Sequence, residues 1–370
     1  MQSFINNDMT NKINWVELTQ VEELDQIRTQ WDHLNQTQHH VNVFNSTSWV
    51  FSWIKTFWQR NWHLRVLTAW HNKKLVAIAP LYYQQSNFLF KSLYPLGQGE
   101  AEEKELASEY LDILINDNAH DNITAKIRPY ISQWIQGLHA DQLSWQALLP
   151  KSNAREIITH LNAQSRISTA TRYRVDCQSW LPDTLSKNMR SRYRRGINQL
   201  NKLEAKIDWV QTEDVEHYWL TMKAFHQSRW QNKDKKGAFY SDEFNQFHAA
   251  FRQKSPKSIA ISAIWVNDVP IALHYYFVDA TTLYFYQSGW DESQYSNLSP
   301  GLILHLWTIE NNNKSFYDFM MGKTQGSYKA KFVTQQQPMY NITTTFRPIK
   351  VMIYRILKKI NRSTSRKATC

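Results

Sequence analysis

The sequence is short of glycine, cysteine and long apolar runs, and each shortage excludes a class of protein. Its 370 residues include only 9 glycines, which leaves little room for glycine-built phosphate loops. The two cysteines, Cys177 and Cys370, cannot form a disulfide framework or a zinc ribbon, which favours a reducing compartment. No run approaches the roughly 20 apolar residues of a membrane span, and the polar N-terminus lacks a signal-peptide core. We therefore expect a cytoplasmic protein.

Motifs of metal and serine-hydrolase chemistry are also missing from the sequence. The 13 histidines include no HExxH spacing, and there is no GxSxG elbow. The sequence thus predicts no metal cofactor. Apolar and aromatic residues are abundant instead: 42% of the residues are hydrophobic and 14% are aromatic, which is enough for a core in each of two domains.

The net charge of +11 is concentrated in residues 187–206 and 347–367. Basic stretches usually meet nucleic acid, anionic lipid or phosphorylated ligands. In the first stretch the cations lie mostly opposite an apolar helical stripe. This stripe consists of Met189, Tyr193, Ile197, Leu200 and Leu203. The stretch is either a solvated helix that packs on the second domain or an arm whose cations, Arg194 and Arg195 among them, hold phosphate.

The two halves of the chain repeat one order of predicted elements, because in each half two helical segments precede a strand hairpin. The segments cover residues 21–34, 46–59 and 64–83 in the first half, and 215–228, 241–251 and 261–278 in the second. Polar residues at 71–74 and 267–268 mark the two hairpin turns. The repetition predicts an α/β protein of two tandem domains, residues 1–165 and 166–370, with mixed sheets flanked by helices.

Several segments carry a family resemblance through their order and spacing. They include FNSTSWVFSWIKTF and SLYPLGQG in the first half, then LSKNMRSRYRRGINQL, FHQSRW and FYDFMMGKTQGSYKAKF in the second. On these segments the chain resembles the GNAT-like acetyltransferases of the CelD, or cellulose-biosynthesis, type, which are related to the Fem peptidyltransferases. The resemblance implies two tandem GNAT-like domains that use acyl-CoA, for example acetyl-CoA, as a co-substrate.

The resemblance also implies a reaction and its partners. An acetyl or longer acyl group would move to an amino group of a sugar or of a cell-envelope or polysaccharide precursor, either a small molecule or a lipid-linked one. Nucleic acid is not an expected partner. Two alternatives stay open. One is a Fem-like transferase that uses aminoacyl-tRNA, although the sequence shows no long helical-hairpin insertion of the kind that Fem proteins often carry. The other is a non-enzymatic basic protein that binds RNA or a membrane.

GNAT enzymes bind the CoA pyrophosphate with a glycine-rich turn at a helix start, and this chain has no good copy of that turn. The nearest match, YRRGIN, has Tyr193 and Asn198 in the wrong places. At the expected position, between a strand and a helix, stand Ser299, Pro300 and Gly301. The serine can cap the helix, and the glycine lets the backbone approach an anion. The segment either holds cofactor phosphate or caps the helix without a ligand.

The strand over residues 282–291 is the predicted place of the acyl group. Gly289 marks an irregularity that would aim a backbone N–H at the thioester carbonyl. Strand alternation places Tyr286 and Ser288 on one face, where they would contact the substrate. Tyrosines on a strand also serve as ordinary packing residues, so both interpretations stay open.

Three further candidates lie near the end of the second half. In GNAT enzymes a tyrosine just after the corresponding strand often protonates the departing thiolate, so the resemblance makes Tyr328 the candidate general acid. Lys329 beside it would contact phosphate or substrate. Asp318 lies in an apolar strand, where a carboxylate is costly unless it is paired. It either binds the substrate amine or fixes a neighbouring arginine.

His226 and Arg229 are three residues apart on one predicted helix and therefore share a face. In this position His226 would act as a catalytic base or a substrate contact, and Arg229 would contact the substrate. The alternative is a structural histidine, which is the commoner role of a lone histidine on a helix.

Residues 348–360 predict a basic amphipathic helix. Its apolar stripe consists of Ile349, Met352, Ile353, Ile356, Leu357 and Ile360. Pro348 suits the first helical position, and no acidic residue follows Asp318. The stripe either packs on the second domain or lies on the anionic inner face of a membrane, which would make the protein peripheral there.

Overall fold

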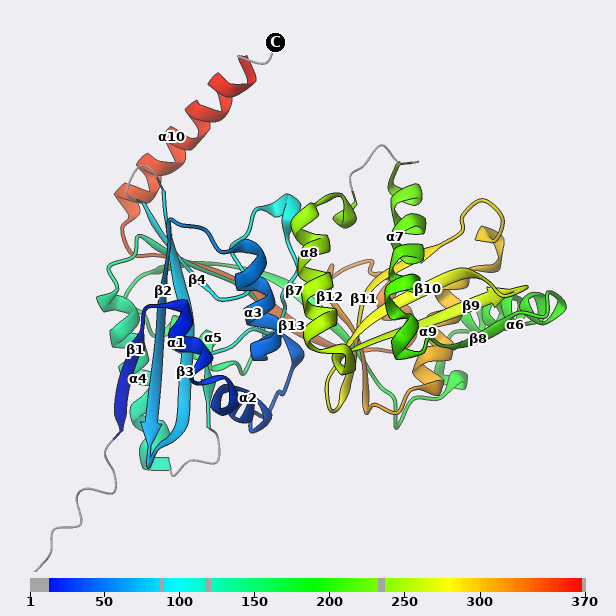
Figure 1. Ribbon diagram of the computed structural model, residues 1–370, viewed down its shortest axis with the longest axis horizontal. Coiled ribbons are helices and arrows are strands. Elements are labelled where there is room, and N and C mark those ends of the chain that lie inside the picture. Colours follow the sequence, from blue (N-terminus) through cyan, green and yellow to red (C-terminus); the bar gives the residue numbers. More distant parts are fainter. Residues whose placement is uncertain (1–12, 87–89, 117–120, 232–236, 368–370) are drawn as a thin grey trace, which may run out of the picture. The chain divides into compact units, whose positions relative to one another are not determined.

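The computed structural model describes residues 13–86, 90–116, 121–231 and 237–367, which fold into two compact units (Figure 1). Unit 1 comprises Met1–Gly99, Ala107–Thr169 and Tyr340–Cys370, and unit 2 comprises Glu100–Leu106 and Ala170–Met339. Each unit is a mixed sheet flanked by helices, so the predicted α/β fold is confirmed. The compact units assign residues 100–106 to unit 2 and residues 340–370 to unit 1.

In unit 1 the sheet has the strand order β1-β2-β3-β4-β6-β13, with β5 beside β3. The strands are β1 (Asn14–Leu18), β2 (Trp62–His71), β3 (Lys74–Gln85), β4 (Lys91–Pro95), β5 (Leu114–Ile115), β6 (Gln142–Leu148) and β13 (Gln335–Thr345). The helices are α1 (Val21–Asp25), α2 (Arg28–Gln36), α3 (Thr47–Phe57), α4 (Asp121–Gly137), α5 (Asn153–Thr159) and α10 (Pro348–Lys367). The single helix expected over residues 21–34 is two helices, because the backbone of Ile27 leaves helical geometry.

In unit 2 the strand order is β7-β12-β11-β10-β9-β8. The strands are β7 (Gln164–Asp176), β8 (Lys206–Trp209), β9 (Ile259–Val266), β10 (Val269–Val278), β11 (Thr282–Trp290) and β12 (Phe316–Gly322). The helices are α6 (Lys187–Lys202), α7 (Val215–Gln231), α8 (Asp242–Lys254), α9 (Pro300–Asn311) and the short 3₁₀ helix η8 (Tyr328–Phe332).

Both predicted hairpins form, with tight turns at the predicted places. β2 pairs with β3 and β9 pairs with β10, both antiparallel. The turn residues Asn72 and Lys73, and likewise Asn267 and Asp268, all have positive φ. Two consecutive positive φ values define the turn whose twist matches that of the flanking strands. The polar turn residues therefore specified the hairpins correctly.

Helices cover both faces of the sheet in unit 2. Neighbouring residues of a strand point to opposite faces, and β10 shows the two layers directly. The ring of Tyr275 contacts Trp219 of α7, whereas the hydroxyl of Tyr276 lies 2.9 Å from the hydroxyl of Thr308 in α9. α7 and α9 thus lie on opposite faces of the sheet.

β11 carries a bulge that changes the direction of its side chains. Tyr275 pairs with Gln287 and Tyr276 pairs with Phe285, so Tyr286 is the extra residue. The irregularity predicted at Gly289 is therefore three residues away, because Gly289 pairs in register with Leu273. For the residues of β11 after Tyr286, the bulge also exchanges the two faces of the sheet to which the side chains were predicted to point.

Gly289 is instead a point of close approach between β11 and α7. A Cβ atom at this position would lie 2.5 Å from the carbonyl oxygen of Met222 and 3.0 Å from the Cβ of Phe225. Backbone at that distance cannot rotate away as a side chain could. The glycine is thus explained by helix–sheet packing.

No helix in the described ranges is both long and apolar enough to cross a membrane.

We predict that Gly289→Ala destabilises the protein by about 1–3 kcal/mol, the usual effect of overpacking a close contact. Gly137→Ala is the matched control, since a Cβ at Gly137 in α4 would meet no atom within 4 Å. This control should be neutral or slightly stabilising, because alanine favours a helix over glycine. Urea denaturation of both variants measures the difference, and equal stabilities would contradict the packing argument.

Candidate active site

A pocket of about 500 Å³ lies in unit 2 beside β11. β11 and β12 pair in parallel only from Thr282 to Tyr284, and the pocket-lining residues of β11 all follow that point. The lining comprises Met189, Arg192, Arg229, His274, Phe285, Ser288, Trp290, Ser299, Pro300, Gly301, Leu302, His305, Tyr328, Lys331 and Phe332. The pocket therefore brings together five predicted site residues, namely Arg229, Ser288, Ser299, Gly301 and Tyr328.

The bulge at Tyr286 decides which β11 side chains reach the pocket. Because of the extra residue, Ser288 follows Phe285 onto the pocket face, while the ring of Tyr286 contacts Phe244 and His248 of α8. The Tyr286 hydroxyl donates to the carbonyl of Leu106 at 2.6 Å. Tyr286 and Ser288 thus do not share a face, and only Ser288 lines the pocket.

α9 begins at the pocket, with Ser299 at its N-cap and Pro300 at its first position, as predicted. Ser299 has a left-handed backbone with φ of 56°, which a residue other than glycine rarely adopts. Its side chain does not cap the helix. The hydroxyl instead accepts a hydrogen bond of 2.9 Å from Arg192 of α6. Gly301 lies next to Trp290 and His274, since a Cβ there would be 3.6 and 3.8 Å from their rings.

Three cations line the pocket, and among the described residues no carboxylate does. Besides Arg192 they are Lys331 and Arg229, whose guanidinium lies 4.0 Å from the ring centroid of Trp290 and pairs with Glu292 at 3.1 Å. The positive end of the α9 dipole adds to this field. The pocket is therefore suited to an anionic ligand.

Arg194 and Arg195 lie on the exposed side of α6 and do not line the pocket. Gly196, which follows them in the YRRGIN segment, has a role in helix packing and not in a phosphate-binding turn. A Cβ on Gly196 would lie 2.6 Å from Ile303 and 3.0 Å from the carbonyl of Leu298. Gly196 thus lets α6 pack closely against the start of α9, and this contact positions Arg192 one turn earlier.

Two buried histidines and Tyr328 form the titratable part of the pocket. The rings of His274 and His305 have centroids 4.4 Å apart, and the His305 ring is 6.1 Å from that of Tyr328. Burial lowers the pKa of His274 to about 3 and the pKa of His305 well below its usual value. Desolvation raises the pKa of Tyr328 to about 12, against a smaller opposite effect of Arg229. At neutral pH the phenol is protonated and both imidazoles are neutral.

His274, which lines the pocket, has a buried ring nitrogen without a hydrogen-bond partner among the described residues. Its side chain is 1% exposed, and its Nδ1 has no hydrogen-bond partner in the described part of the chain. His305 differs, because its Nδ1 lies 2.7 Å from the hydroxyl of Tyr317. A buried polar atom without a partner is costly, so His274 has capacity for a ligand. Sequence reasoning missed both histidines, although each stands alone in an apolar segment.

Asp318 is fully buried and lies outside the pocket lining. It pairs with Arg172 at 2.5 Å, and its other oxygen accepts a 2.7 Å hydrogen bond from the amide of Met320. Met320 has a positive φ of 61° and lies in an irregularity of the β12–β7 pairing. Of the two predicted roles, the structure shows the one in which the carboxylate fixes an arginine.

Two other candidates also make internal contacts. The Nζ of Lys329 donates to the carbonyls of Phe319 and Met321 at 2.5 and 2.6 Å and so ties η8 to β12. His226 is buried, and its Nε2 accepts a hydrogen bond of 2.9 Å from Trp230. Burial and the charge of Arg229 lower the pKa of His226 to about 4. Neither side chain lines the pocket.

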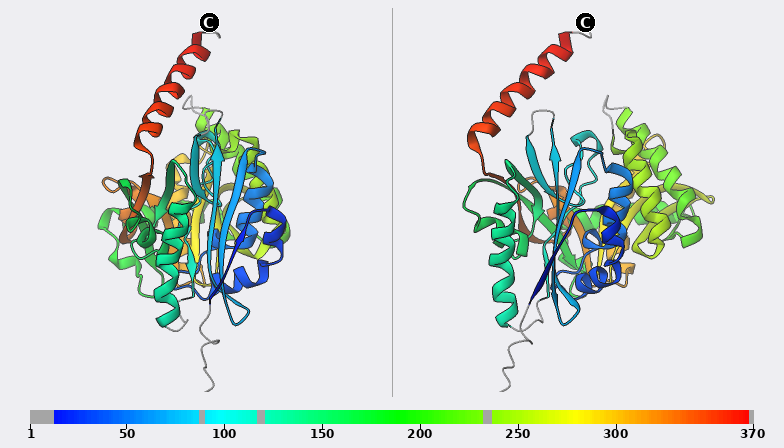
Figure 2. Two further views of the ribbon diagram at one scale, coloured as in Figure 1. Left: turned by 90° about the vertical axis from the view of Figure 1, so that its left-hand side faces the viewer. Right: turned by 60° about the vertical axis from the view of Figure 1, so that its left-hand side comes forward.

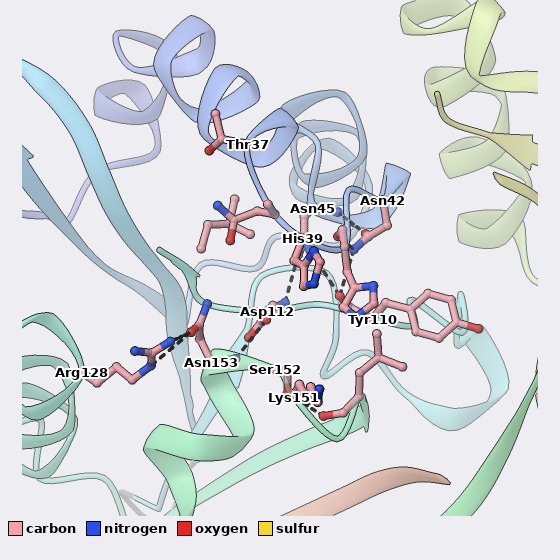
Figure 3. A pocket seen from close by; sticks show the side chains of 14 residues that line it. Thr37, His39, Asn42, Asn45, Tyr110, Asp112, Arg128, Lys151, Ser152 and Asn153 are labelled. Atoms are coloured by element: carbon pink, nitrogen blue, oxygen red, sulfur yellow. Dashed lines mark hydrogen bonds between the residues drawn. The ribbon is translucent and has the colours of Figure 1, made fainter. Parts of the chain in front are cut away.

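A second pocket of about 530 Å³ lies within unit 1, between α2 and α5 (Figure 3). Its polar side chains bond mainly to backbone groups of unit 1. The carboxylate of Asp112 accepts from the amides of Asn153 and Ala154 at the start of α5. The side-chain oxygen of Asn153 accepts from Arg128 at 2.7 Å, and that of Asn45 accepts from the amide of Asp112 at 3.0 Å. This network holds the loops of unit 1 together.

We predict that His274→Gln weakens the dependence of stability on pH. The pKa of His274 is depressed in the folded state, so its contribution is present above the unfolded pKa of about 6.5 and is lost as the pH falls below it. Between pH 7 and pH 5 the wild type should lose about 2 kcal/mol more unfolding free energy than the variant. Urea denaturation at both pH values measures this. Thr308→Val, which removes a buried hydroxyl that does not titrate, should keep the wild-type difference, and an unchanged difference in His274→Gln would refute the assignment.

Comparison with known proteins gives this geometry a context. Residues 187–330 match a family described as an acetyltransferase (GNAT) domain. No curated protein matches the sequence significantly. The fold is similar to the crystal structure of FemX, with a TM-score of 0.62 and 8% identity over 92% of this chain and 99% of that one. It is also similar to a conserved protein of unknown function from Bacteroides thetaiotaomicron VPI-5482, with a TM-score of 0.52 and 10% identity over 90% of this chain and 100% of that one. Residues 187–330 thus match the GNAT acetyltransferase domain, in a chain whose fold is similar to that of FemX.

Proposed function

We propose that the protein is an acyl-CoA-dependent N-acyltransferase of the CelD type whose active site is the pocket of unit 2. The acceptor is the amino group of a sugar or of a cell-envelope or polysaccharide precursor, either a small molecule or a lipid-linked one. The observation that carries the proposal is that one pocket is lined by a cationic helix start, by apolar and aromatic side chains and by a protonated tyrosine. We place the protein in the cytoplasm, where acyl-CoA is available.

The cationic end of the pocket is suited to the phosphates of the donor. CoA is a polyanion, and the pocket offers Arg192, Lys331 and the start of α9 with no opposing carboxylate among the described residues. Helix N-termini and arginines are the usual ligands of phosphate in proteins. Arg192 is held in place by its bond to Ser299 and by the close packing of α6 on α9.

The apolar part of the pocket is suited to the arm and acyl group of the donor. Phe285, Trp290 and Phe332 line it. In the described structure β11 has no β12 partner beyond Tyr284, so the edge of the strand can accept an extended ligand there. The bulge at Tyr286 interrupts the regular ladder at this place, and the N–H of a bulge can polarise a thioester carbonyl.

Tyr328 is assigned to the departing thiolate and His274 to positioning. A phenol with a pKa of about 12 keeps its proton at neutral pH, and it can donate that proton to the sulfur as the C–S bond breaks. The amine attacks the carbonyl carbon and loses its own proton to water. An imidazole with a pKa of about 3 is too weak a base to take that proton, but its lone pair can accept a hydrogen bond from the ligand.

We predict that acetyl-CoA or a longer acyl-CoA raises the melting temperature of the protein by mass action. Arg192→Gln should weaken donor binding by about tenfold or more, since one charge-assisted contact contributes roughly 1.5–3 kcal/mol. Lys202→Gln removes the same charge from the far end of α6 and should bind like the wild type. Calorimetric titration with each acyl-CoA provides the affinities. Tight binding of aminoacyl-tRNA together with no binding of any acyl-CoA would favour a Fem-type transferase instead.

We predict that Tyr328→Phe lowers turnover by roughly 10²–10⁴-fold, the range typical of acid–base groups, and leaves stability intact. Transfer of labelled acetyl groups to a panel of amino sugars and nucleotide-linked amino sugars measures turnover. The affinity for acetyl-CoA should stay unchanged, which separates a role in chemistry from a role in binding. Turnover within twofold of the wild type in a folded variant would exclude Tyr328 as the acid.

A further inference from the structure

α10 presents an apolar face that the rest of unit 1 does not cover. Figures 1 and 2 show the helix leaving the strands of unit 1 and extending away from them. The four side chains that carry this face in its first half are largely exposed. They are Ile349 at 73%, Met352 at 57%, Ile353 at 49% and Ile356 at 52%. Within unit 1 the stripe is therefore left uncovered.

The helix is attached to unit 1 by its other side. Val351 is only 3% exposed, and the ring of Tyr354, three residues later, stacks on Phe90 with centroids 4.0 Å apart. Lys350 forms an ion pair of 2.9 Å with the fully buried Asp141. Successive residues of a helix are about 100° apart, so the attached side and the exposed stripe point in nearly opposite directions. The attachment thus fixes the first turns and directs the stripe outwards.

An exposed apolar face of this kind indicates an interaction site. Isolated apolar side chains are normal on a protein surface, but contiguous apolar patches usually mark an interaction site. Four large apolar residues within eight positions of one helix form such a patch.

The charge around the stripe identifies the kind of partner. α10 contains seven cations and no acidic residue, and no acidic residue follows Asp318 anywhere in the sequence. Lys358 and Lys359 lie in the same exposed part of the helix as Ile356. A second copy of the helix would bring like charges together. A lipid surface that combines apolar chains with anionic headgroups complements both features.

We propose that α10 docks on an anionic membrane surface, with its apolar stripe at the boundary between headgroups and acyl chains. The helix lies on the bilayer and does not cross it, in keeping with its many cations. This inference goes beyond the acyltransferase reaction, and its test does not use activity. Together with the reaction it favours a lipid-linked acceptor over a freely diffusing one.

The test is co-sedimentation of the full chain with vesicles of phosphatidylcholine alone or of an equal mixture with phosphatidylglycerol. The wild type should bind the mixed vesicles, bind the neutral ones much more weakly, and lose binding as salt is added. Ile353→Glu combined with Ile356→Glu should abolish binding. The matched control is Leu220→Glu combined with Val269→Glu, which adds the same charges at apolar residues of unit 2 that are 57% and 61% exposed. The control should bind like the wild type.

A second variant isolates the electrostatic contribution. Lys358→Gln combined with Lys359→Gln should weaken binding to the mixed vesicles by about thirtyfold, since each cation near such a surface contributes about fivefold. Thermal unfolding checks that each variant is folded.

Three results would overturn the inference. The first is no binding to mixed vesicles at low salt, and the second is equal binding to neutral and mixed vesicles. The third is self-association of the wild type, seen by sedimentation velocity and removed by the Ile353 and Ile356 substitutions, without vesicle binding. That result would show that a second copy of the chain covers the stripe.

Discussion

The pocket of unit 2 depends on the buried ion pair between Asp318 and Arg172. Asp318 is the last residue of β12 that pairs with β11, and its carboxylate also binds the amide of Met320 in the irregularity that follows. An unpaired carboxylate at 0% exposure would be strongly destabilising, so the arginine and the carboxylate require each other. Together they fix the point at which β12 departs from its regular course. Lys329 then ties η8 to the end of β12, which delivers Tyr328 to the pocket.

Local patterns in the sequence were enough to predict the frame of this site. Asn267 and Asp268 specified a hairpin because two consecutive positive φ values suit these residues, and Pro300 marked the start of α9 because its missing N–H is not needed there. The face of the sheet to which each side chain of β11 points could not be predicted in the same way. A bulge such as that at Tyr286 leaves no signature in the alternation of side chains, yet it exchanges the faces of every residue that follows. Gly289 was predicted to mark a strand irregularity because it is a glycine. The structure gives another reason for this glycine, namely the close approach of the backbone of α7.

The two pockets differ in how their polar groups are satisfied. In unit 1 the carboxylate of Asp112 accepts from the backbone amides of Asn153 and Ala154 at the start of α5, so this polar network stabilises the fold. In unit 2 the hydroxyl of Ser299 is turned away from its own helix by a left-handed backbone, and the Nδ1 of His274 is left unsatisfied among the described residues. Strained backbone and unsatisfied buried atoms are costly and tend to persist where a ligand offsets the cost. Backbone strain does not separate the two pockets, because Tyr110 in the lining of the unit 1 pocket also has a positive φ of 61°. The Nδ1 of His274, unsatisfied within the described part of the chain, is the difference that supports the proposal of chemistry in unit 2.

The basic charge of the chain follows the same division. On α6, the residue that matters is the one that packing places beside α9: Gly196 brings the helices together, and Arg192 one turn earlier reaches Ser299, whereas Arg194 and Arg195 face solvent. On α10 the cations accompany an exposed apolar stripe. A cation held by a second contact at a helix start is suited to a specific phosphate, because its position is fixed. Cations spread along an amphipathic helix are suited to a surface of many anions, where position matters little and number matters most. The net charge of +11 thus has two separate physical meanings in one chain.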